Sequence, residues 1–355
     1  MLIAIAFTGW FVIVVPLRAD FLDNDLTLVY MAARIGVDHG WSHIYSLPLQ
    51  QQTFSELRPG VSWHSGRWFV AAPPYAWLLG PLVPLGPGGA VAIWLAVAVL
   101  SLAGAWWVAA PASRWTRVLW LLGALAWYPV LYALSLVQPD FVAMLLVAAG
   151  WKLAESRRPY FAGAVLGLTV IKPQLVLLLP LVLLTSGRWR VVVTWAAVAA
   201  ALALVSLVVL GPGGLGDYRS ILNQVQQIPN NRYFTPAYVL GPGPLGYAFS
   251  AMVVVIAGVA GYVNRHAGLA RVFALGLVAT AIGATYWHLE DFSILVLAAW
   301  FFWRDEPPAW QRAWLLVVAL CAEFAWGLTP LPVLLGVAVW FAFLVVRPGA
   351  RRVTA

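Results

Sequence analysis

Long apolar segments recur along the whole chain, and they restrict this protein to one broad class of fold. Residues of the AVILMFWYC set make up 63% of the sequence, and charged residues make up only 10%. A soluble globular protein has about 25% charged residues, and about 45–50% apolar residues even when Gly is counted. The 21 Trp residues favour the same class, because Trp prefers the membrane–water interface. We therefore expect an integral membrane protein, and exclude soluble, fibrous, disordered and disulfide-scaffold classes.

The apolar segments predict an all-α bundle of about twelve spans in one domain, residues 1–355. They are residues 1–17, 89–110, 118–135, 140–152, 160–186, 191–210, 245–263, 271–287, 290–303, 313–329 and 331–346. The segment 160–186 is too long for one simple helix, and Lys172-Pro173 lies at its centre. Because Pro disfavours helix at its own position and the one before, we expect a hairpin of two short helices. Four prolines in residues 70–86 predict a re-entrant or interfacial segment.

Basic residues are distributed unevenly between the loops. One orientation places fourteen of the 21 Lys and Arg in cytoplasmic loops, and leaves most of the 13 acidic residues outside. The positive-inside rule therefore predicts a multi-pass protein of a bacterial-type cell membrane, with both termini cytoplasmic and loops 18–69 and 211–243 outside. We attribute the net charge of +8 to cytoplasmic loops. A nucleic-acid partner is not expected, since basic residues are not clustered among aromatic ones.

The two predicted outer loops are too long to be simple connections. In the first, apolar residues recur at helical spacing, which predicts an amphipathic helix lying flat on the membrane surface. These residues are Leu26, Val29, Tyr30, Ala33 and Val37. The second loop is rich in Asn, Gln, Pro and Gly, and we expect it to form a lid over the first.

Asp23-Asn24-Asp25 follows the first span and admits three interpretations. The carboxylates of Asp23 and Asp25 could bind a divalent cation, Mg²⁺ or Mn²⁺, which prefers hard oxygen ligands. One carboxylate could act as a general base. Alternatively, Asn24 or Asp25 could be the N-cap of the following helix. A divalent cation is the only cofactor that these residues suggest.

Two further groups of residues could carry chemistry. The sequence Tyr286-Trp287-His288-Leu289-Glu290-Asp291 lies where one span ends and the next begins. His288 could donate a hydrogen bond or accept a proton near neutral pH, or be an interfacial His beside a Trp anchor. Lys172 lies within an apolar segment, where an ammonium group needs a partner, and an anion such as a phosphate would be a natural one. The alternative is that Lys172 extends to the interface.

Several stretches, taken in order, resemble the GT-C superfamily of multispan glycosyltransferases, and in particular glycosyltransferase family 87. DLTLVYMAARIGVDHGWSHIY is similar to the family's D-F-x-x-Y-Y-x-A-A pattern, and APPYAWLLGPL to its Y-P-P-L run. LSLVQPDFVAMLL and FAGAVLGLTVIKPQLVLLL are similar to its G-Q and A-G-x-x-x-G…K-P stretches. WHLEDFSILVL is similar to its late His. The sequence departs from the pattern at Leu26 and Val29, and at Val137, where the family has Gly before Gln138.

The resemblance implies an inverting enzyme that transfers a hexose, often mannose, from a polyprenyl-phosphate donor on the extracytoplasmic face. A lipid or glycan is the implied acceptor, and membrane lipids are the surroundings. Asp25 occupies the acidic position expected for the base, and His288 is the second catalytic candidate. Lys172, Arg232 and His288 are candidates for binding the donor phosphate. The expected substrate-binding residues are Tyr30, Arg34, Tyr75, Gln138, Glu290 and Asp291.

Two other functions compete with this interpretation. A lipid-linked oligosaccharide ligase uses similar donors, but a ligase would be expected to carry more basic residues in a large late outer loop than Arg219 and Arg232. A secondary transporter would be expected to have internal repeats and ionisable groups at the bilayer midplane.

Overall fold

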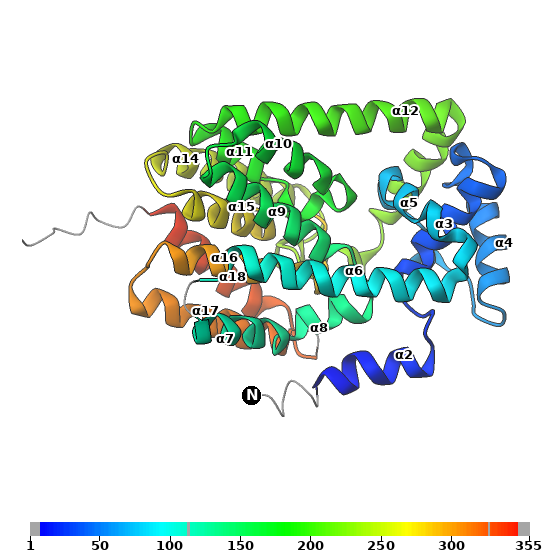
Figure 1. Ribbon diagram of the computed structural model, residues 1–355, viewed down its shortest axis with the longest axis horizontal. Helices are drawn as coiled ribbons and strands as arrows, with labels where there is room; N and C mark the ends of the chain where they lie inside the picture. The colour runs from blue at the N-terminus through cyan, green and yellow to red at the C-terminus, as the bar shows by residue number, and fades with distance from the viewer. Residues whose placement is uncertain (1–7, 112–113, 326, 347–355) are drawn as a thin grey trace, which may run out of the picture.

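The computed structural model describes residues 8–111, 114–325 and 327–346, and every element in those ranges is helical (Figure 1). The α-helices are α2 (Val15–Ala19), α3 (Asp25–His39), α4 (Leu47–Leu57), α5 (Pro73–Leu79), α6 (Gly86–Ala109), α7 (Arg114–Leu125), α8 (Tyr128–Ser135), α9 (Asp140–Glu155), α10 (Pro159–Gly167), α11 (Leu179–Thr185), α12 (Trp189–Val225), α13 (Ala237–Leu240), α14 (Pro244–Val263), α15 (Leu269–Gly283), α16 (Ile294–Arg304), α17 (Ala309–Glu323) and α18 (Leu331–Val345). The shorter 3₁₀ and π segments are η1 (Trp10–Val14), η2 (Trp41–His43), η3 (Ser65–Arg67), η4 (Gly80–Leu85), η5 (Leu168–Ile171), η6 (Pro173–Val176), η7 (Pro229–Arg232) and η8 (Glu290–Ser293). The predicted all-α class is confirmed for these ranges.

The helices pack around two hydrophobic cores. The larger core joins α8–α11 and α14–α18, and buries large side chains such as Trp151, Phe273 and Phe301. The smaller core joins α3, α4 and α5 to the start of α6 and the far part of α12. We call residues 20–85 the head; it lies at the right end of the molecule in Figure 1.

Helix α3 begins and ends at residues whose chemistry sets its limits. The side chain of Asn24 accepts a hydrogen bond from the Thr27 N–H at 3.2 Å, so the predicted N-cap is present. Gly40 follows the helix with φ of 98°, a conformation that Gly adopts without steric cost. Its position at a membrane surface stays a prediction, but other parts of the head cover more than its predicted apolar face. Residues outside the predicted apolar face, including Met31 and Ile35, are also fully buried, because α4, α5 and η4 pack around α3.

The proline-rich segment 70–86 breaks into two short helices, α5 and η4. Pro73 and Pro74 occupy the first turn of α5, where a helix has no use for their missing N–H groups. Both elements pack against α3 and so belong to the head. Gly86, with φ of 74°, then leads into the long helix α6. The irregular backbone predicted here is observed, whereas its position in a membrane stays a prediction.

The segment 160–186 is broken at the predicted point. Helix α10 passes through η5 to Lys172, whose φ and ψ of −148° and 69° are not helical. Pro173 starts η6, and α11 follows. Two short helical arms therefore meet at Lys172, as the Lys-Pro dipeptide predicts.

The predicted lid loop 211–243 is wrong for its first half, which is helical. Helix α12 continues to Val225 across a kink at Gly211, which has φ of 61° and is followed by Pro212. Beyond the kink, α12 packs against η2 of the head, and the rings of Tyr218 and Tyr45 stack with centroids 4.3 Å apart. Residues 226–243 carry only η7 and α13. The segment does cover part of the first predicted loop, as expected of a lid, but the part that does so is mainly helix α12.

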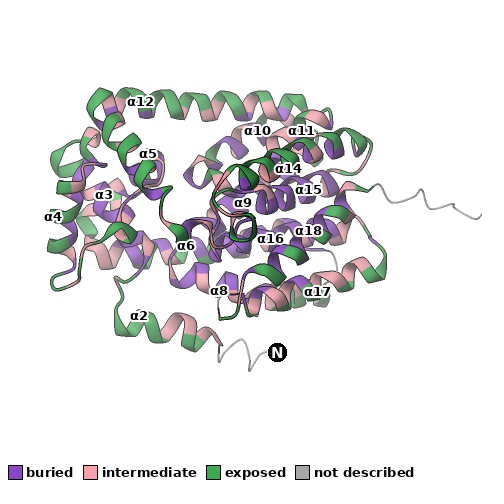
Figure 2. Cartoon of the chain, turned by 180° about the vertical axis from the view of Figure 1, so that it is seen from behind, coloured by how far each residue is buried: buried purple, intermediate pink, exposed green. Residues whose placement is uncertain are grey.

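The described residues contain three helical stretches long and apolar enough to cross a membrane: Pro73–Ala109, Trp189–Val225 and Pro244–Val263. A fourth is possible if α7 and α8, bent by 62°, form one span. Shorter apolar helices surround them, and about twelve spans are not confirmed. Along α12, exposed residues predominate (Figure 2), and they include large apolar side chains such as Leu204 and Val208. Apolar residues on all sides are typical of a helix in lipid.

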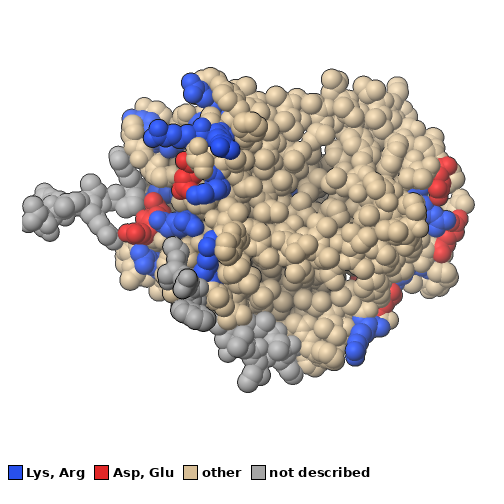
Figure 3. Space-filling view, in the orientation of Figure 1, with Lys and Arg blue, Asp and Glu red and all other residues tan. Residues whose placement is uncertain are grey.

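Charged side chains gather at the two ends of the molecule (Figure 3). A broad belt without Lys, Arg, Asp or Glu separates them on the face shown, as expected for a surface that contacts hydrocarbon. The head forms one end, and the other end carries mostly basic side chains (Figures 1 and 3). The predicted location of both chain termini falls on residues outside the described ranges.

Candidate active site

Asp25 is the first residue of α3, and the elements around it fix its position. Its N–H donates to the carbonyl of Leu136 at 3.2 Å, which ties the start of α3 to the turn before α9. Its carboxylate accepts a hydrogen bond from the side-chain amide of Gln138. Burial, followed by the charge of Glu290, raises the pKa of Asp25 to about 6, while His288 and Lys172 oppose the shift. Asp25 can therefore change its protonation state close to neutral pH.

Gln138 connects Asp25 to a buried charged network around Lys172. The Lys172 ammonium donates to Gln138 Oε1 at 3.1 Å and to Asp140 Oδ2 at 2.6 Å. It also forms an ion pair with Asp291 Oδ1 at 2.8 Å. Ser293 donates its hydroxyl to the other oxygen of Asp140 at 3.2 Å. The Lys172 side chain is 7% exposed, and those of Asp140 and Asp291 are 0% and 1% exposed.

This network supplies different partners for Lys172 from the anionic ligand expected from its position in the sequence. The Lys172 ammonium donates hydrogen bonds to Gln138 and Asp140. The Asp291 carboxylate adds a second negative charge at 2.8 Å, without accepting a hydrogen bond at Oδ1 from the residues that the structure describes. The alternative that Lys172 extends to the membrane interface is also wrong, since its side chain is buried within the protein. A signal was present in the sequence, because the acidic residue Asp140 lies in an apolar segment and could have been matched to Lys172, the lysine at the centre of another.

His288 lies in the loop between α15 and η8, where both nitrogens of its ring have a polar neighbour. Nδ1 lies 3.3 Å from Glu290 Oε1, and Nε2 lies 3.1 Å from Asn231 Oδ1. Its backbone N–H donates to Asp291 at 2.9 Å, which joins this loop to the Lys172 network. Burial alone would lower the pKa of His288, but the hydrogen bond to Glu290 and the nearby carboxylate charges raise it above its usual value. His288 can therefore carry a positive charge near Asp25.

An open pocket of about 220 Å³ lies beside Asp25, between the start of α3 and the turn around η3. Its lining residues are Leu22, Asp23, Asn24, Asp25, Thr27, Leu28, Phe54, Arg58, His64, Gly66, Arg67 and Leu136. Three of these, Arg58, His64 and Arg67, are basic side chains that the sequence pattern did not single out. Their separation from Asp25 in the sequence gives no periodic signal, and only the folding of the head brings them to the pocket.

The geometry around Asp23 does not fit the metal-binding interpretation. Its carboxylate lies 3.7 Å from the guanidinium groups of both Arg58 and Arg67. Asp25 instead interacts with Gln138, so the two carboxylates are engaged by different partners. Within the described ranges, no group of three or more His, Cys, Asp or Glu side chains could hold a metal ion.

The remaining predicted site residues divide into two groups. Glu290 and Gln138 belong to the network described above, and Tyr75 is buried and interacts electrostatically with Lys172, Asp140 and Asp25. Tyr30 and Arg34 lie apart from it. The Tyr30 hydroxyl donates to the carbonyl of Val83 at 3.0 Å, which is a packing role. Arg34 forms ion pairs with Asp38 and Glu56, at 3.4 Å and 2.9 Å, on the exposed side of the head.

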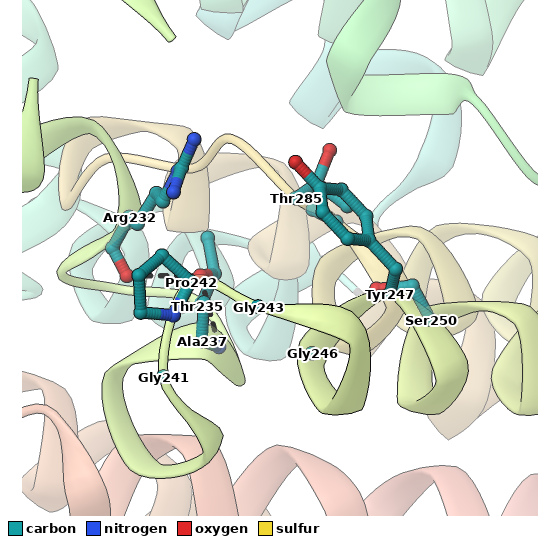
Figure 4. A pocket seen from close by; sticks show the side chains of 11 residues that line it. Arg232, Thr235, Ala237, Gly241, Pro242, Gly243, Gly246, Tyr247, Ser250 and Thr285 are labelled. Atoms are coloured by element: carbon teal, nitrogen blue, oxygen red, sulfur yellow. Dashed lines mark hydrogen bonds between the residues drawn. The ribbon is translucent and has the colours of Figure 1, made fainter. Parts of the chain in front are cut away.

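Arg232 is not part of the Lys172 network. Its guanidinium donates to the carbonyl of Gln226, and its side chain lines a small hollow with Thr235, Tyr247 and Thr285 (Figure 4). The neighbouring Asn231 contacts His288, so the backbone connects the hollow to the network. The structure therefore brings together Asp25, Gln138, Lys172, His288, Glu290 and Asp291, and leaves Arg232 at the edge.

Comparison with known proteins identifies the family. The profile of glycosyltransferase family 87 matches residues 69–330, which is well over half of the chain. The matched range includes Gln138, Lys172 and His288, and begins after Asp25. Neither the comparison with curated proteins nor that with solved structures gave a match. The chain belongs to glycosyltransferase family 87, and it is a glycosyltransferase.

Proposed function

We propose that this protein transfers a hexose, with mannose as the first candidate, from a polyprenyl-phosphate donor to a hydroxyl group of a lipid or glycan acceptor. The observation that carries the proposal is the position of Asp25. Asp25 lines a pocket together with basic side chains, and its pKa of about 6 suits a general base near neutral pH. A lipid-linked donor also suits an enzyme rich in apolar helices, because such a donor reaches the site from the bilayer.

In the proposed reaction, the acceptor oxygen attacks the anomeric carbon of the sugar while Asp25 takes the acceptor proton. The bond between the anomeric carbon and the phosphate oxygen breaks, and the polyprenyl phosphate leaves with the bonding electrons. The configuration at the anomeric carbon is inverted, because nucleophile and leaving group lie on opposite faces. A positioned base contributes about 10²–10⁴-fold to such a rate.

The buried network would hold Asp25 in place and set its charge. Gln138 donates to Asp25 and is itself held by Lys172, which Asp140 and Asp291 anchor. His288, protonated and close to the same carboxylates, would stabilise the negative charge that develops on the leaving phosphate. Tyr75, buried beside the network, would help to close this side of the site.

We propose that the reaction takes place on the extracytoplasmic face. The mainly basic end of the molecule lies opposite the head (Figure 3), and basic ends favour the cytoplasmic side. Asp25 and its pocket belong to the head and would then face outward.

The function can be tested with purified protein in nanodiscs and a panel of radiolabelled donors. We expect transfer from a polyprenyl-phosphate hexose to an added lipid or glycan acceptor, and no transfer from the matching nucleotide sugar. Release of an inverted product would support the mechanism. Transfer from the nucleotide sugar alone would overturn the donor assignment.

A further inference from the structure

Two arginines in the pocket beside Asp25 are positioned for a ligand that the network around Lys172 cannot hold. Arg58 is buried in the head, where its side chain is only 7% exposed. It donates a hydrogen bond to the Leu22 carbonyl and forms an ion pair with Asp20. Arg67 is the last residue of η3, and its guanidinium lies over the ring of Phe54, 5.3 Å from the centroid. Both residues line the same pocket as Asp25.

The hydrogen bonding of Arg67 is incomplete. Its Nε donates to His64 Nε2 at 3.1 Å. Its two terminal nitrogens make no hydrogen bond to the residues that the structure describes; the nearest carboxylate, Asp23, is 3.7 Å away. That distance is too long for a hydrogen bond. Arg67 therefore has up to four N–H groups without an acceptor among the described residues, in the fork geometry that suits a phosphate.

Asp23 occupies the position that an anion would take between the two arginines. Its carboxylate lies 3.7 Å from Arg58 and 3.7 Å from Arg67, with no hydrogen bond to either. Its side chain is 63% exposed, so it can move into solvent at little cost. Asp23 thus resembles a placeholder that neutralises the two cations without satisfying them.

The balance of charge favours this location over the Lys172 network. Around Lys172 and His288 lie four carboxyl groups, those of Asp25, Asp140, Glu290 and Asp291. A phosphate bound there would add negative charge to a cluster that already contains more acids than bases. Carboxylates also lie around Arg58 and Arg67, namely those of Asp20, Asp23 and Asp25. Displacing the exposed Asp23, however, would leave two carboxylates against two arginines, and Arg67 free to pair with the incoming anion.

We propose that Arg58 and Arg67, with His64 at their side, form the subsite for the phosphate of the lipid-linked donor, and that Asp23 occupies this subsite when no donor is bound. This inference rests on the proposed function for the identity of the ligand. It replaces Lys172 and Arg232 as the main phosphate contacts, and His288 would act on the leaving phosphate through its charge, without lining the same pocket. It also places the phosphate and Asp25 in one pocket, so that a sugar can lie between base and leaving group.

The test measures binding of a polyprenyl monophosphate, with the uncharged polyprenol of equal length as reference, to full-length protein in phosphatidylcholine nanodiscs. We expect Arg67→Gln to weaken binding of the phosphate about tenfold to hundredfold, as for loss of a charge-assisted hydrogen bond, without changing binding of the polyprenol. Arg67→Lys should recover only part of the affinity. Arg219→Gln removes an exposed arginine that lies outside the pocket, and should bind like wild type.

Asp23→Ala provides a variant with the opposite expected sign. Removal of the competing carboxylate should increase affinity for the monophosphate several-fold, and a decrease would contradict the placeholder role. Arg58 is a poorer first target, since removing one partner of a buried pair is strongly destabilising. Arg58→Lys, which keeps the charge, should retain the fold and lose part of the affinity.

The outcomes separate this inference from the proposed function. Unchanged monophosphate affinity and unchanged donor KM in Arg67→Gln would overturn the subsite even if wild type transfers the sugar. Phosphate binding that depends on Arg67, in a wild type that transfers no sugar from polyprenyl-phosphate donors, would support the subsite and contradict the function. Loss of the Arg67 dependence in phosphatidylglycerol nanodiscs would show that bilayer headgroups occupy the site, and would overturn the assignment to the donor.

Discussion

At the scale of single residues, the proposed reaction requires the Asp25 carboxyl group to be ionised. Its pKa of about 6 is raised by burial, so the active carboxylate form is gained as pH rises through that value. We expect kcat/KM to rise about tenfold per pH unit below 6, to level off above it, and to fall again at higher pH as His288 loses its proton. A pH–rate profile of the wild type checks this, provided that the donor stays intact across the range.

Gln138 should influence the same profile, because its amide donates to the Asp25 carboxylate. A hydrogen bond to the ionised form lowers a carboxyl pKa, so Gln138→Leu should raise the pKa of Asp25 further. The acidic limb should then move to higher pH, with a smaller loss of rate at pH 8 than at pH 6. A profile that only drops in height, with its midpoint unmoved, would show that Gln138 does not act through Asp25.

Lys172 should be required for stability as well as for activity. Lys172→Met leaves Asp140 and Asp291 buried without a cation, which costs about 3–5 kcal/mol. Thermal unfolding in detergent should show a large loss, and the double variant Lys172→Met/Asp140→Asn should recover part of it. Lys152→Met is the matched control, since this other lysine forms an exposed pair with Glu155 that is worth about 0–1 kcal/mol. Equal stability of the two single variants would contradict the buried network.

Val137 differs from the family pattern in its side chain and has an unusual backbone conformation. The family pattern has Gly at this place, and Val137 adopts φ of 54°, in the left-handed region that a β-branched residue rarely enters. The position therefore needs the unusual backbone whatever its side chain, because the turn carries Gln138 toward Asp25. The departure from the pattern was visible in the sequence, whereas the retained geometry was not.

At the scale of elements, the contact between α12 and the head should be sensitive to side-chain size. A Cβ at Gly214 would overlap with the carbonyl oxygen of Ser42, in η2. Gly214→Val should therefore push α12 away from the head, with a cost of about 1–3 kcal/mol and reduced transfer. Gly213→Val is the control, because a Cβ there meets nothing within 4 Å. Similar stability and activity of the two variants would show that this close approach has no role.

Elements were predictable where local chemistry decides them. The Lys172-Pro173 break follows from the geometry of Pro, and α3 follows from its periodicity and its Asn24 cap. The helix from residue 211 to Val225 was not predictable, because Gly and Pro suggest a loop and only packing on the head keeps the chain helical there. The burial of α3 was missed for the same reason, since its neighbours come from distant parts of the sequence. Arg58 and Arg67 likewise reach Asp23 only through tertiary folding.

At the scale of the whole molecule, the separation of charge predicts its orientation in the membrane. In a Cys321→Ser background, we expect Ser62→Cys on the head to react with a membrane-impermeant reagent in intact cells. Ser156→Cys, next to basic residues at the turn after α9, should react only after permeabilisation. Both positions are exposed, so accessibility within the protein does not distinguish them. The reverse pattern would place the pocket in the cytoplasm and contradict an extracytoplasmic reaction.

The central claim is that Asp25 removes the acceptor proton in the pocket of the head. The most direct measurement is single-turnover transfer by Asp25→Asn from a bound polyprenyl-phosphate sugar, compared with Asp217→Asn, which changes an exposed acid on α12. We expect Asp25→Asn to fold and bind donor like wild type, but to transfer the sugar at least about 100-fold more slowly. We also expect Asp217→Asn to keep the wild-type rate. Transfer by Asp25→Asn at the wild-type rate would remove Asp25 from the mechanism and contradict the account.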